Sequence, residues 1–247
     1  SIKYLFYKNM KVIFYGNSLT EGIPGVGFFN ILKNKLPNYN LVNKGRGGDT
    51  VISLYRRMKR MNITNHDIAF IWVGTNDVLA KVRKDYPIVK ILSGQIWSKT
   101  DIEFERYYRK TIELINKKSK KIFTITPIFI GENINNKWNK KLDKKSDVIK
   151  RVSKDYEKVE FVDIRKKIYP KLLTNKSDYI IKNSLKVMMD YLRYRDYNRA
   201  DKKSKERGLQ FTLDGVHLNS KGAEIVADIF YEKIREEIDS KKTHSKN

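Results

Sequence analysis

Five short runs rich in apolar residues alternate with segments of helical periodicity, and this alternation constrains the fold more than any other feature of the chain. Ile68 to Val73 is the clearest run, since it is continuously apolar and lies between Asp67 and Gly74. Buried strands of parallel sheets have this pattern. The five runs lie at residues 12–15, 39–42, 68–73, 122–126 and 159–162. They predict an α/β domain with a central five-stranded parallel sheet covered by helices on both faces.

The segments between these runs have the features of helices. Residues 28–36 carry apolar side chains at helical spacing and end before Pro37. A lysine-rich helix is expected over 136–154, whereas residues 78–100 are expected to be irregular. Candidate capping residues precede three further helices, and these are Asp49 or Thr50, Thr100, and Asn219 or Ser220.

Residues 170–211 interrupt the alternation. Ile181, Leu185, Met188 and Leu192 recur at helical spacing and predict a helix of about four turns. We expect a helical insertion here, before the last helix. It forms either a cap over the carboxyl edge of the sheet or an ordinary pair of surface helices. Residues 1–240 are then a single domain, and 241–247 form a basic, disordered tail.

Length and composition narrow the class of protein. The 247 residues suit one sizeable domain, and the absence of cysteine excludes disulfides, thiolate zinc sites and a cysteine nucleophile. No apolar run approaches the ~20 residues of a membrane span. Ser1 to Asn9 lack the apolar core of a signal peptide, and Met10 is a candidate natural start. These features predict a cytoplasmic protein.

The chain is strongly basic, with 52 Lys and Arg against 28 Asp and Glu, for a net charge of +24. One interpretation is attraction to nucleic acid, anionic membrane or acidic ligands. The other is codon bias with solvated lysines. The basic residues are spread along the chain and interleave with acidic ones, which favours the second interpretation. We expect weak association with anionic surfaces and no specific nucleic-acid partner.

A small polar loop follows the first apolar run. Gly16 ends the run and Ser18 follows it, at the carboxyl end of a strand, where open α/β sheets place their chemistry. Gly16 and Gly22 permit the tight turns that such a loop needs. Alternatively, Asn17, Ser18 and Thr20 only form a turn that caps the next helix.

A serine nucleophile needs a base and a third group that orients the base. Of the three histidines, His244 lies in the tail and His66 precedes a strand, at the wrong end of the sheet. His217 remains. Asp214 precedes it by three residues, and Gly215 between them permits a turn in which the carboxylate reaches Nδ1 while Nε2 faces outward. Alternatively, this segment is only a turn that caps the last helix.

Acyl transfer also needs donors that face the developing oxyanion. Three are expected on loops at the same sheet edge: the backbone N–H of Ser18, the N–H of Gly48, and the side-chain amide of Asn76. A glycine lets the backbone approach a ligand closely, and an amide donates without a titrating charge. Each residue alone suits an ordinary turn, but together the four loops supply a complete acyl-transfer set.

Four segments resemble the sequence blocks of SGNH (GDSL-type) hydrolases, in the order of that family and across residues 11–219. These segments are Gly16-Asn-Ser-Leu-Thr20, Gly48 within 43–50, Gly74-Thr-Asn-Asp77 and Asp214-Gly-Val-His217. The resemblance implies a flavodoxin-like three-layer α/β/α sandwich and a serine ester-hydrolase mechanism without metal or cofactor.

Carried over to this chain, the resemblance makes Ser18 the nucleophile, His217 the base and Asp214 its orienting acid. It also makes Ser18, Gly48 and Asn76 the oxyanion hole. Asn17 stands where the family signature usually has Asp; this position is outside the triad, and an amide there keeps a neutral hydrogen bond.

The family's substrates include lipid and lysophospholipid esters, thioesters, short acetyl esters and acetylated sugars. Met188 and Met189 in the insertion favour an acyl chain, because methionine suits adaptable apolar surfaces, and the positive charge favours an anionic substrate. We expect hydrolysis of short- to medium-chain acyl esters, including lysophospholipids or thioesters. A carbohydrate O-acetyl esterase is the alternative within the same fold.

Two hypotheses from other classes are a phosphate- or nucleotide-binding module and a polyanion-binding protein. Residues 44–50, between a strand and a helix, would hold phosphate at the helix N-terminus. However, the first loop lacks the Lys-Ser/Thr of a P-loop. The polyanion-binding hypothesis has no zinc-finger or RNA-recognition signature, and it leaves Ser18, Asn76 and His217 unexplained.

Overall fold

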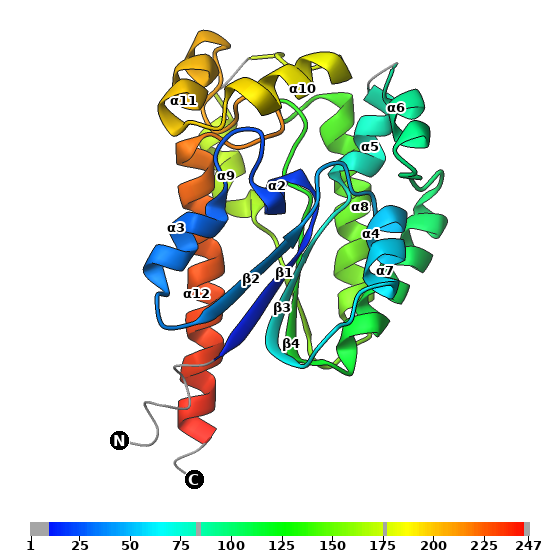
Figure 1. The fold of residues 1–247 in the computed structure, drawn as a ribbon, viewed down its shortest axis with the longest axis vertical. Coiled ribbons are helices and arrows are strands. Elements are labelled where there is room, and N and C mark those ends of the chain that lie inside the picture. The colour runs from blue at the N-terminus through cyan, green and yellow to red at the C-terminus, as the bar shows by residue number, and fades with distance from the viewer. Residues whose placement is uncertain (1–9, 83–84, 175–176, 245–247) are drawn as a thin grey trace.

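The centre of the fold is an all-parallel sheet of five strands in the order β2-β1-β3-β4-β5 (Figure 1). The computed structural model describes residues 10–82, 85–174 and 177–244; residues 1–9, which precede the candidate start at Met10, and residues 245–247 of the expected tail lie outside it. The strands are β1 (Lys11–Gly16), β2 (Asn40–Gly45), β3 (His66–Trp72), β4 (Ser119–Ile125) and β5 (Val159–Val162). Each overlaps the apolar run that predicts it, so the five-stranded parallel sheet is confirmed.

Helices cover both faces of this sheet. On one face lie α3 (Phe28–Lys35) and α12 (Ser220–His244); on the other lie α4 (Val51–Lys59), α7 (Asp101–Asn116) and α8 (Lys137–Ser153) (Figure 1). Successive strand residues point to opposite faces. Val12 and Phe14 accordingly pack in the cluster of α3 and α12, and Ile13 and Tyr15 in that of α4, α7 and α8. The three-layer α/β/α sandwich is confirmed.

The helix starts follow the expected capping chemistry. Thr50, rather than Asp49, caps α4 through a reciprocal capping box with Ser53. Asn219 precedes α12, and its Oδ1 accepts from the N–H of Gly222 at 3.0 Å. At the other end, α12 continues to His244, so residues 241–244 of the expected tail are helical.

The prediction that residues 78–100 are irregular is wrong. The chain there forms α5 (Thr75–Val82) and α6 (Tyr86–Leu92). Pro87 stands in the first turn of α6, where a missing N–H costs no intrahelical hydrogen bond. Gly94, at φ 68°, then ends the helix, and the N–H of Gln95 donates to the carbonyl of Lys90 at 2.8 Å. Proline and glycine here mark the boundaries of a short helix.

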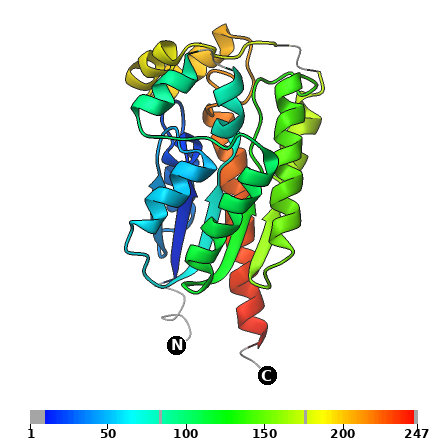
Figure 2. The ribbon, with the colours of Figure 1, turned by 90° about the vertical axis from the view of Figure 1, so that its right-hand side faces the viewer.

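The insertion lies over the carboxyl ends of the strands (Figures 1 and 2). It follows α9 (Arg165–Leu172) and contains α10 (Ser184–Arg193) and α11 (Tyr197–Glu206). The predicted four-turn helix is shorter than expected, because it begins at Ser184. Ile181 lies ahead of α10 and is buried. Leu185, Met188 and Leu192 are 59%, 55% and 66% exposed, so the predicted apolar stripe faces outward.

A polar contact fixes the inner side of α10 instead. Asp190 is buried and forms an ion pair of 2.8 Å with Arg207, whose guanidinium also donates to the carbonyl of Leu213 at 2.9 Å. A buried ion pair with satisfied hydrogen bonds holds a helix in one orientation without apolar packing. The apolar side of α10 is therefore left toward solvent and toward the pocket described below.

Candidate active site

Ser18 opens α2 (Ser18–Glu21), the short helix that follows β1. Asn17 caps this helix, since its Oδ1 accepts from the N–H of Leu19 at 3.0 Å. Gly16 leaves room for the turn, because a Cβ there would lie 2.2 Å from Thr20 Oγ1. Both interpretations of this loop therefore describe it: the segment caps a helix and also places Ser18 at a pocket.

Asp214 and His217 lie in a tight turn ahead of α12. The N–H of Leu213 donates to the carbonyl of His217 at 2.7 Å, which closes the turn. Gly215 has φ 88°, and a Cβ there would lie 2.6 Å from the carbonyl oxygen of Tyr179, so this position requires glycine. Asp214 Oδ1 accepts from the backbone N–H of His217 at 2.8 Å, which holds the carboxylate beside the ring.

The fold brings Ser18, His217 and Asp214 into one hydrogen-bond chain. Ser18 Oγ lies 3.0 Å from His217 Nε2, across 199 residues of sequence, and His217 Nδ1 lies 2.7 Å from Asp214 Oδ2. A carboxylate only accepts, so it places the ring hydrogen on Nδ1 and leaves Nε2 to accept from the serine hydroxyl. Such a chain can take the proton of the hydroxyl and stabilise the imidazolium that results.

Gly48 and Asn76 lie at the same edge of the sheet. Gly48, at φ 78°, follows β2, and Asn76 lies in the first turn of α5 rather than on a loop. Asn76 is 4% exposed, and its Nδ2 donates to the carbonyl of Asp49 at 2.9 Å. Ser18, Gly48, Asn76 and His217 all line one pocket of about 360 Å³, with Asp214 behind the imidazole.

Apolar side chains supply much of the remaining wall of this pocket. Val187 and Met188 come from α10, so the insertion forms part of the site. Glu21 also lines the pocket; burial raises the pKa of its carboxyl, while the backbone N–H of Gly47 opposes that rise. The pocket thus combines an apolar wall with a small number of polar groups, as ligand sites commonly do.

His66 lies at the opposite edge of the sheet, as expected, at the start of β3. Its Nε2 is 2.6 Å from Ser119 Oγ, and its Nδ1 is 2.8 Å from the carbonyl oxygen of Thr64. Burial lowers the pKa of His66. His244 is the last residue of α12 and lies far along the chain from the pocket-lining segments.

Glu132 supports the site, although no motif in the sequence predicts its role. It is fully buried, and its carboxylate accepts from the backbone N–H groups of Gln210, Phe211 and Thr212 at 2.6–2.9 Å. These residues lead directly into the turn with Asp214. The available signal was a single carboxylate after the apolar run 128–130 and a glycine. A carboxylate buried after an apolar run needs hydrogen-bond donors that are buried with it.

Lys90 and Gln95 support the loop that carries Gly48, and they too were missed. The Lys90 ammonium donates to the carbonyl of Gly48 and lies 2.6 Å from Gln95 Oε1. Gln95 Nε2 donates to the carbonyl of Gly47 at 3.0 Å. Lys90 is 2% exposed. No sequence signal separates it from the many solvated lysines.

The amino end of α4, where a nucleotide-binding module would hold phosphate, is occupied by protein acceptors. The N–H of Val51 donates to Asp77 Oδ2 at 2.9 Å, and the N–H of Ser53 donates to Thr50 Oγ1 at 3.2 Å. Asp77 is itself buried and accepts from Ser98. A carboxylate of the chain therefore lies where this hypothesis places a phosphate.

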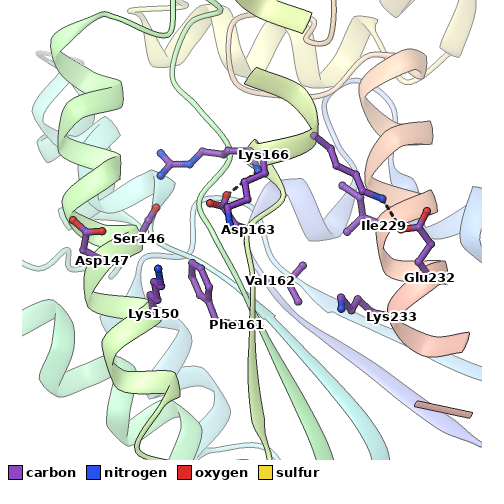
Figure 3. Close-up of a pocket in the computed structure, with 12 residues that line it drawn as sticks. Ser146, Asp147, Lys150, Phe161, Val162, Asp163, Lys166, Ile229, Glu232 and Lys233 are labelled. Carbon is purple, nitrogen blue, oxygen red and sulfur yellow. Dashed lines mark hydrogen bonds and ion pairs between the residues drawn. The ribbon is translucent and has the colours of Figure 1, made fainter. Parts of the chain in front are cut away.

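A second hollow of about 410 Å³ lies beside β5, between α8, α9 and α12 (Figure 3). Some of its charged groups pair with one another or with backbone: Lys167 donates to Glu232 at 2.5 Å, and Asp163 Oδ1 accepts from the N–H of Arg165. Ser146 lines it, but the described lining residues include no histidine. This hollow therefore lacks the serine–histidine pair of the Ser18 pocket.

Two further findings concern ligands and membranes. Across residues 10–82, 85–174 and 177–244, no three His, Asp or Glu side chains are grouped so as to hold a metal ion. None of the helices in these same ranges combines the length and the apolar character that crossing a membrane requires.

The fold is shared with solved esterase structures. The acetyl xylan esterase AlAXEase is 24% identical with a TM-score of 0.62, and the match covers 91% of this chain and 100% of that one. A catalytic mutant of Axe2, an acetylxylan esterase from Geobacillus stearothermophilus, is 21% identical with a TM-score of 0.65, covering 91% and 94%. LAE5, an alpha/beta hydrolase enzyme from the metagenome of Lake Arreo, Spain, is 18% identical with a TM-score of 0.61, covering 90% and 93%.

Among curated proteins, none matches the sequence. The model of the GDSL-like lipase/acylhydrolase family, however, matches residues 14–225, which include both the Ser18 loop and the turn with His217. The resemblance drawn from the sequence is thus confirmed. This protein belongs to the GDSL-like lipase/acylhydrolase family and is a serine hydrolase of carboxylic esters.

Proposed function

We propose that Ser18, His217 and Asp214 form a catalytic triad that hydrolyses acyl esters through an acyl-enzyme. The observation that carries this proposal is the hydrogen-bond chain of 3.0 Å and 2.7 Å from Ser18 Oγ through the imidazole to Asp214. The chain ends at a pocket that Gly48 and Asn76 also line. The N–H groups of Ser18 and Gly48 and the amide of Asn76 are the proposed oxyanion hole.

In acylation, His217 Nε2 takes the hydroxyl proton while Ser18 Oγ attacks the carbonyl carbon of the ester. The carbonyl oxygen becomes the oxyanion and accepts hydrogen bonds from the three donors. As the tetrahedral species collapses, the protonated imidazole gives its proton to the alcohol oxygen. The bond between the carbonyl carbon and that oxygen breaks, the alcohol leaves, and the acyl group remains on Ser18.

Deacylation repeats these steps with water as the nucleophile. His217 Nε2 takes a proton from the water, and the resulting hydroxide attacks the acyl carbon. The imidazolium then protonates Ser18 Oγ, which leaves as the free serine, and the carboxylic acid is released. Asp214 accepts from Nδ1 throughout, so it stabilises the imidazolium in both halves of the reaction.

The solved structures support these roles. Variants of Axe2 described as catalytic mutants replace a serine, an aspartate and a histidine, and that aspartate precedes that histidine by three positions. Asp214 and His217 have the same separation in this chain. The spacing suits a turn in which the carboxylate of Asp214 contacts both the backbone N–H and the ring Nδ1 of His217.

The pocket supports short- to medium-chain acyl esters as substrates. Its volume of about 360 Å³ and the apolar side chains of Ile23, Leu79 and Met188 fit an acyl chain of modest length. A second candidate is the O-acetyl group of a carbohydrate. It is favoured because AlAXEase and Axe2, which share this fold, are described as acetyl xylan esterases.

A substrate panel tests both candidates. Purified protein is assayed with p-nitrophenyl esters from acetate to palmitate and with acetylated xylooligosaccharides, beside Ser18→Ala as the control. We expect turnover of the short esters, lost in the variant. A kcat/KM for the acetylated sugar about tenfold above that for p-nitrophenyl acetate would favour the second candidate. Folded protein that cleaves none of these esters would contradict the proposed function.

A further inference from the structure

A pocket of about 310 Å³ adjoins the proposed catalytic pocket, and four arginines line it. Arg46 follows β2, whereas Arg56, Arg57 and Arg60 come from the carboxyl-terminal end of α4. The other lining residues in the described chain are neutral, so no carboxylate faces the four guanidinium groups from the wall of the pocket.

Arg57 has a structural role within this group. It forms an ion pair of 2.8 Å with Asp49, which is fully buried, and donates to the carbonyl of Lys44 at 2.8 Å. These contacts hold the loop after β2 against α4. They also pair Asp49 with Arg57, while Asp49 and Glu21 act on the charge of Arg46 without forming an ion pair with it.

Arg46, Arg56 and Arg60 lack the carboxylate partner that seven of the described arginines have. They are exposed, and within the described residues no carboxylate lies within 4.0 Å of them. Arg109 and Arg207, by contrast, each have a carboxylate at 2.8 Å. A planar guanidinium group binds carboxylate or phosphate with two parallel hydrogen bonds, and several groups around one cavity increase that preference.

The arginine pocket and the proposed catalytic pocket are neighbours that share part of their walls. Ser93 and Gln95 line both. Gln95 is 6% exposed and donates to the carbonyl of Gly47, so the boundary between the pockets is a fixed part of the site. The arginine pocket is therefore the neighbouring pocket on the Gln95 side of the proposed catalytic pocket.

We propose that this arginine pocket binds an anionic group, carboxylate or phosphate, on the alcohol part of the substrate. The substrate class is then acyl esters of anionic alcohols, such as an acylated uronic acid or an acylated sugar phosphate. This inference rests on the proposed function, because it assigns the ester end of the same ligand to Ser18.

The test compares two acetyl esters that differ only at C6, acetylated methyl glucuronide with a carboxylate there and acetylated methyl glucoside with a hydroxymethyl group, at constant ionic strength. The variant is Arg56→Gln with Arg60→Gln. The matched control is Arg106→Gln with Arg235→Gln, which removes the same charge from positions on α7 and α12 outside the arginine pocket. An acetylated glucoside 6-phosphate distinguishes phosphate from carboxylate.

For the wild type we expect kcat/KM for the glucuronide to exceed that for the glucoside by about tenfold, the value of one charge-assisted hydrogen bond. The Arg56→Gln, Arg60→Gln variant should lose most of this preference, and the control should keep it. No preference for either anionic ester, or an equal loss in the control, would overturn the proposal.

Binding to Ser18→Ala protein separates this inference from the proposed function. Calorimetric titration with methyl glucuronide and with inorganic phosphate should show binding that weakens about tenfold when Arg56 and Arg60 are replaced. Such binding without any ester turnover in the wild type would retain the anion site and reject the esterase. Turnover without binding of either anion would retain the esterase and reject the anion site.

Discussion

Two serine–histidine pairs lie at opposite edges of the same sheet. Ser18 and His217 are 3.0 Å apart at the carboxyl edge, and Ser119 and His66 are 2.6 Å apart at the amino edge. Their burial is nearly the same, with Ser119 at 3% and Ser18 at 8% exposed, and both histidines at 4%. Neither the hydrogen bond nor the burial therefore distinguishes a candidate nucleophile from a structural serine.

The two pairs differ in the group that contacts histidine Nδ1 and in the loops that surround the serine. His217 Nδ1 faces the carboxylate of Asp214, whereas His66 Nδ1 faces the neutral carbonyl of Thr64. Only a carboxylate offers a full negative charge to an imidazolium. The carboxyl edge also gathers loops from separate strands around one pocket, as open α/β sheets do.

Replacing each serine by alanine should give the largest difference between the two pairs. Ser18→Ala should lower kcat by about a million-fold, because the proposed nucleophile is absent. Ser119→Ala should leave kcat unchanged and lower the free energy of unfolding by about 1–2 kcal/mol, through the lost hydrogen bond to His66. Ester hydrolysis and urea denaturation measure the two quantities. Substantial activity in folded Ser18→Ala protein would refute its role as nucleophile.

Asp214→Asn should make the His217 pair resemble the His66 pair, since the charged partner becomes neutral. We expect kcat to fall by about 10⁴-fold, because an amide does not stabilise the imidazolium and can favour the wrong tautomer. The measurement is kcat on p-nitrophenyl acetate, with circular dichroism to establish folding. A loss below about tenfold would show that the carboxylate is not what separates the two pairs.

Asn76→Ala tests the surroundings of Ser18 rather than the triad. Removal of one oxyanion donor should lower kcat by about 10²–10³-fold and change KM little, because the amide acts on the charge that develops in the transition state. Steady-state kinetics separate the two parameters. A rise in KM at constant kcat would instead indicate a role in binding the ground state.

The smallest expected effect concerns the pH dependence of stability at His66. Its pKa is lowered in the folded protein from the ordinary value of 6.5, so the unfolded chain binds a proton first as the pH falls. The free energy of unfolding should therefore decrease as the pH falls below 6.5, with a slope from this group of at most about 1.4 kcal/mol per pH unit. His66→Gln should flatten this slope in urea denaturation at pH 7.5 and 5.5. An unchanged slope would exclude His66 as its source.

Much of the fold could be predicted because the strands are short segments rich in apolar residues that alternate with segments of helical periodicity. The fifth run, 159–162, coincides with β5 at both ends, and the helix expected over 136–154 is α8. The boundaries of α6 were missed, since Pro87 and Gly94 stop a helix and also mark an irregular segment. The exposure of the apolar side chains of α10 could not be predicted, because the ion pair of Asp190 with Arg207 orients that helix.

The strands, their alternation with helices and the short polar segments at the strand ends can be predicted from the sequence, because they follow from local apolar pattern and turn chemistry. Which side chains meet follows from the tertiary arrangement alone. Ser18 reaches His217 across 199 residues, and Glu132 and Lys90 gain their roles only from distant backbone groups. Such contacts form because loops from separate strands meet at the carboxyl edge of the sheet, and local sequence propensity does not specify which loops meet.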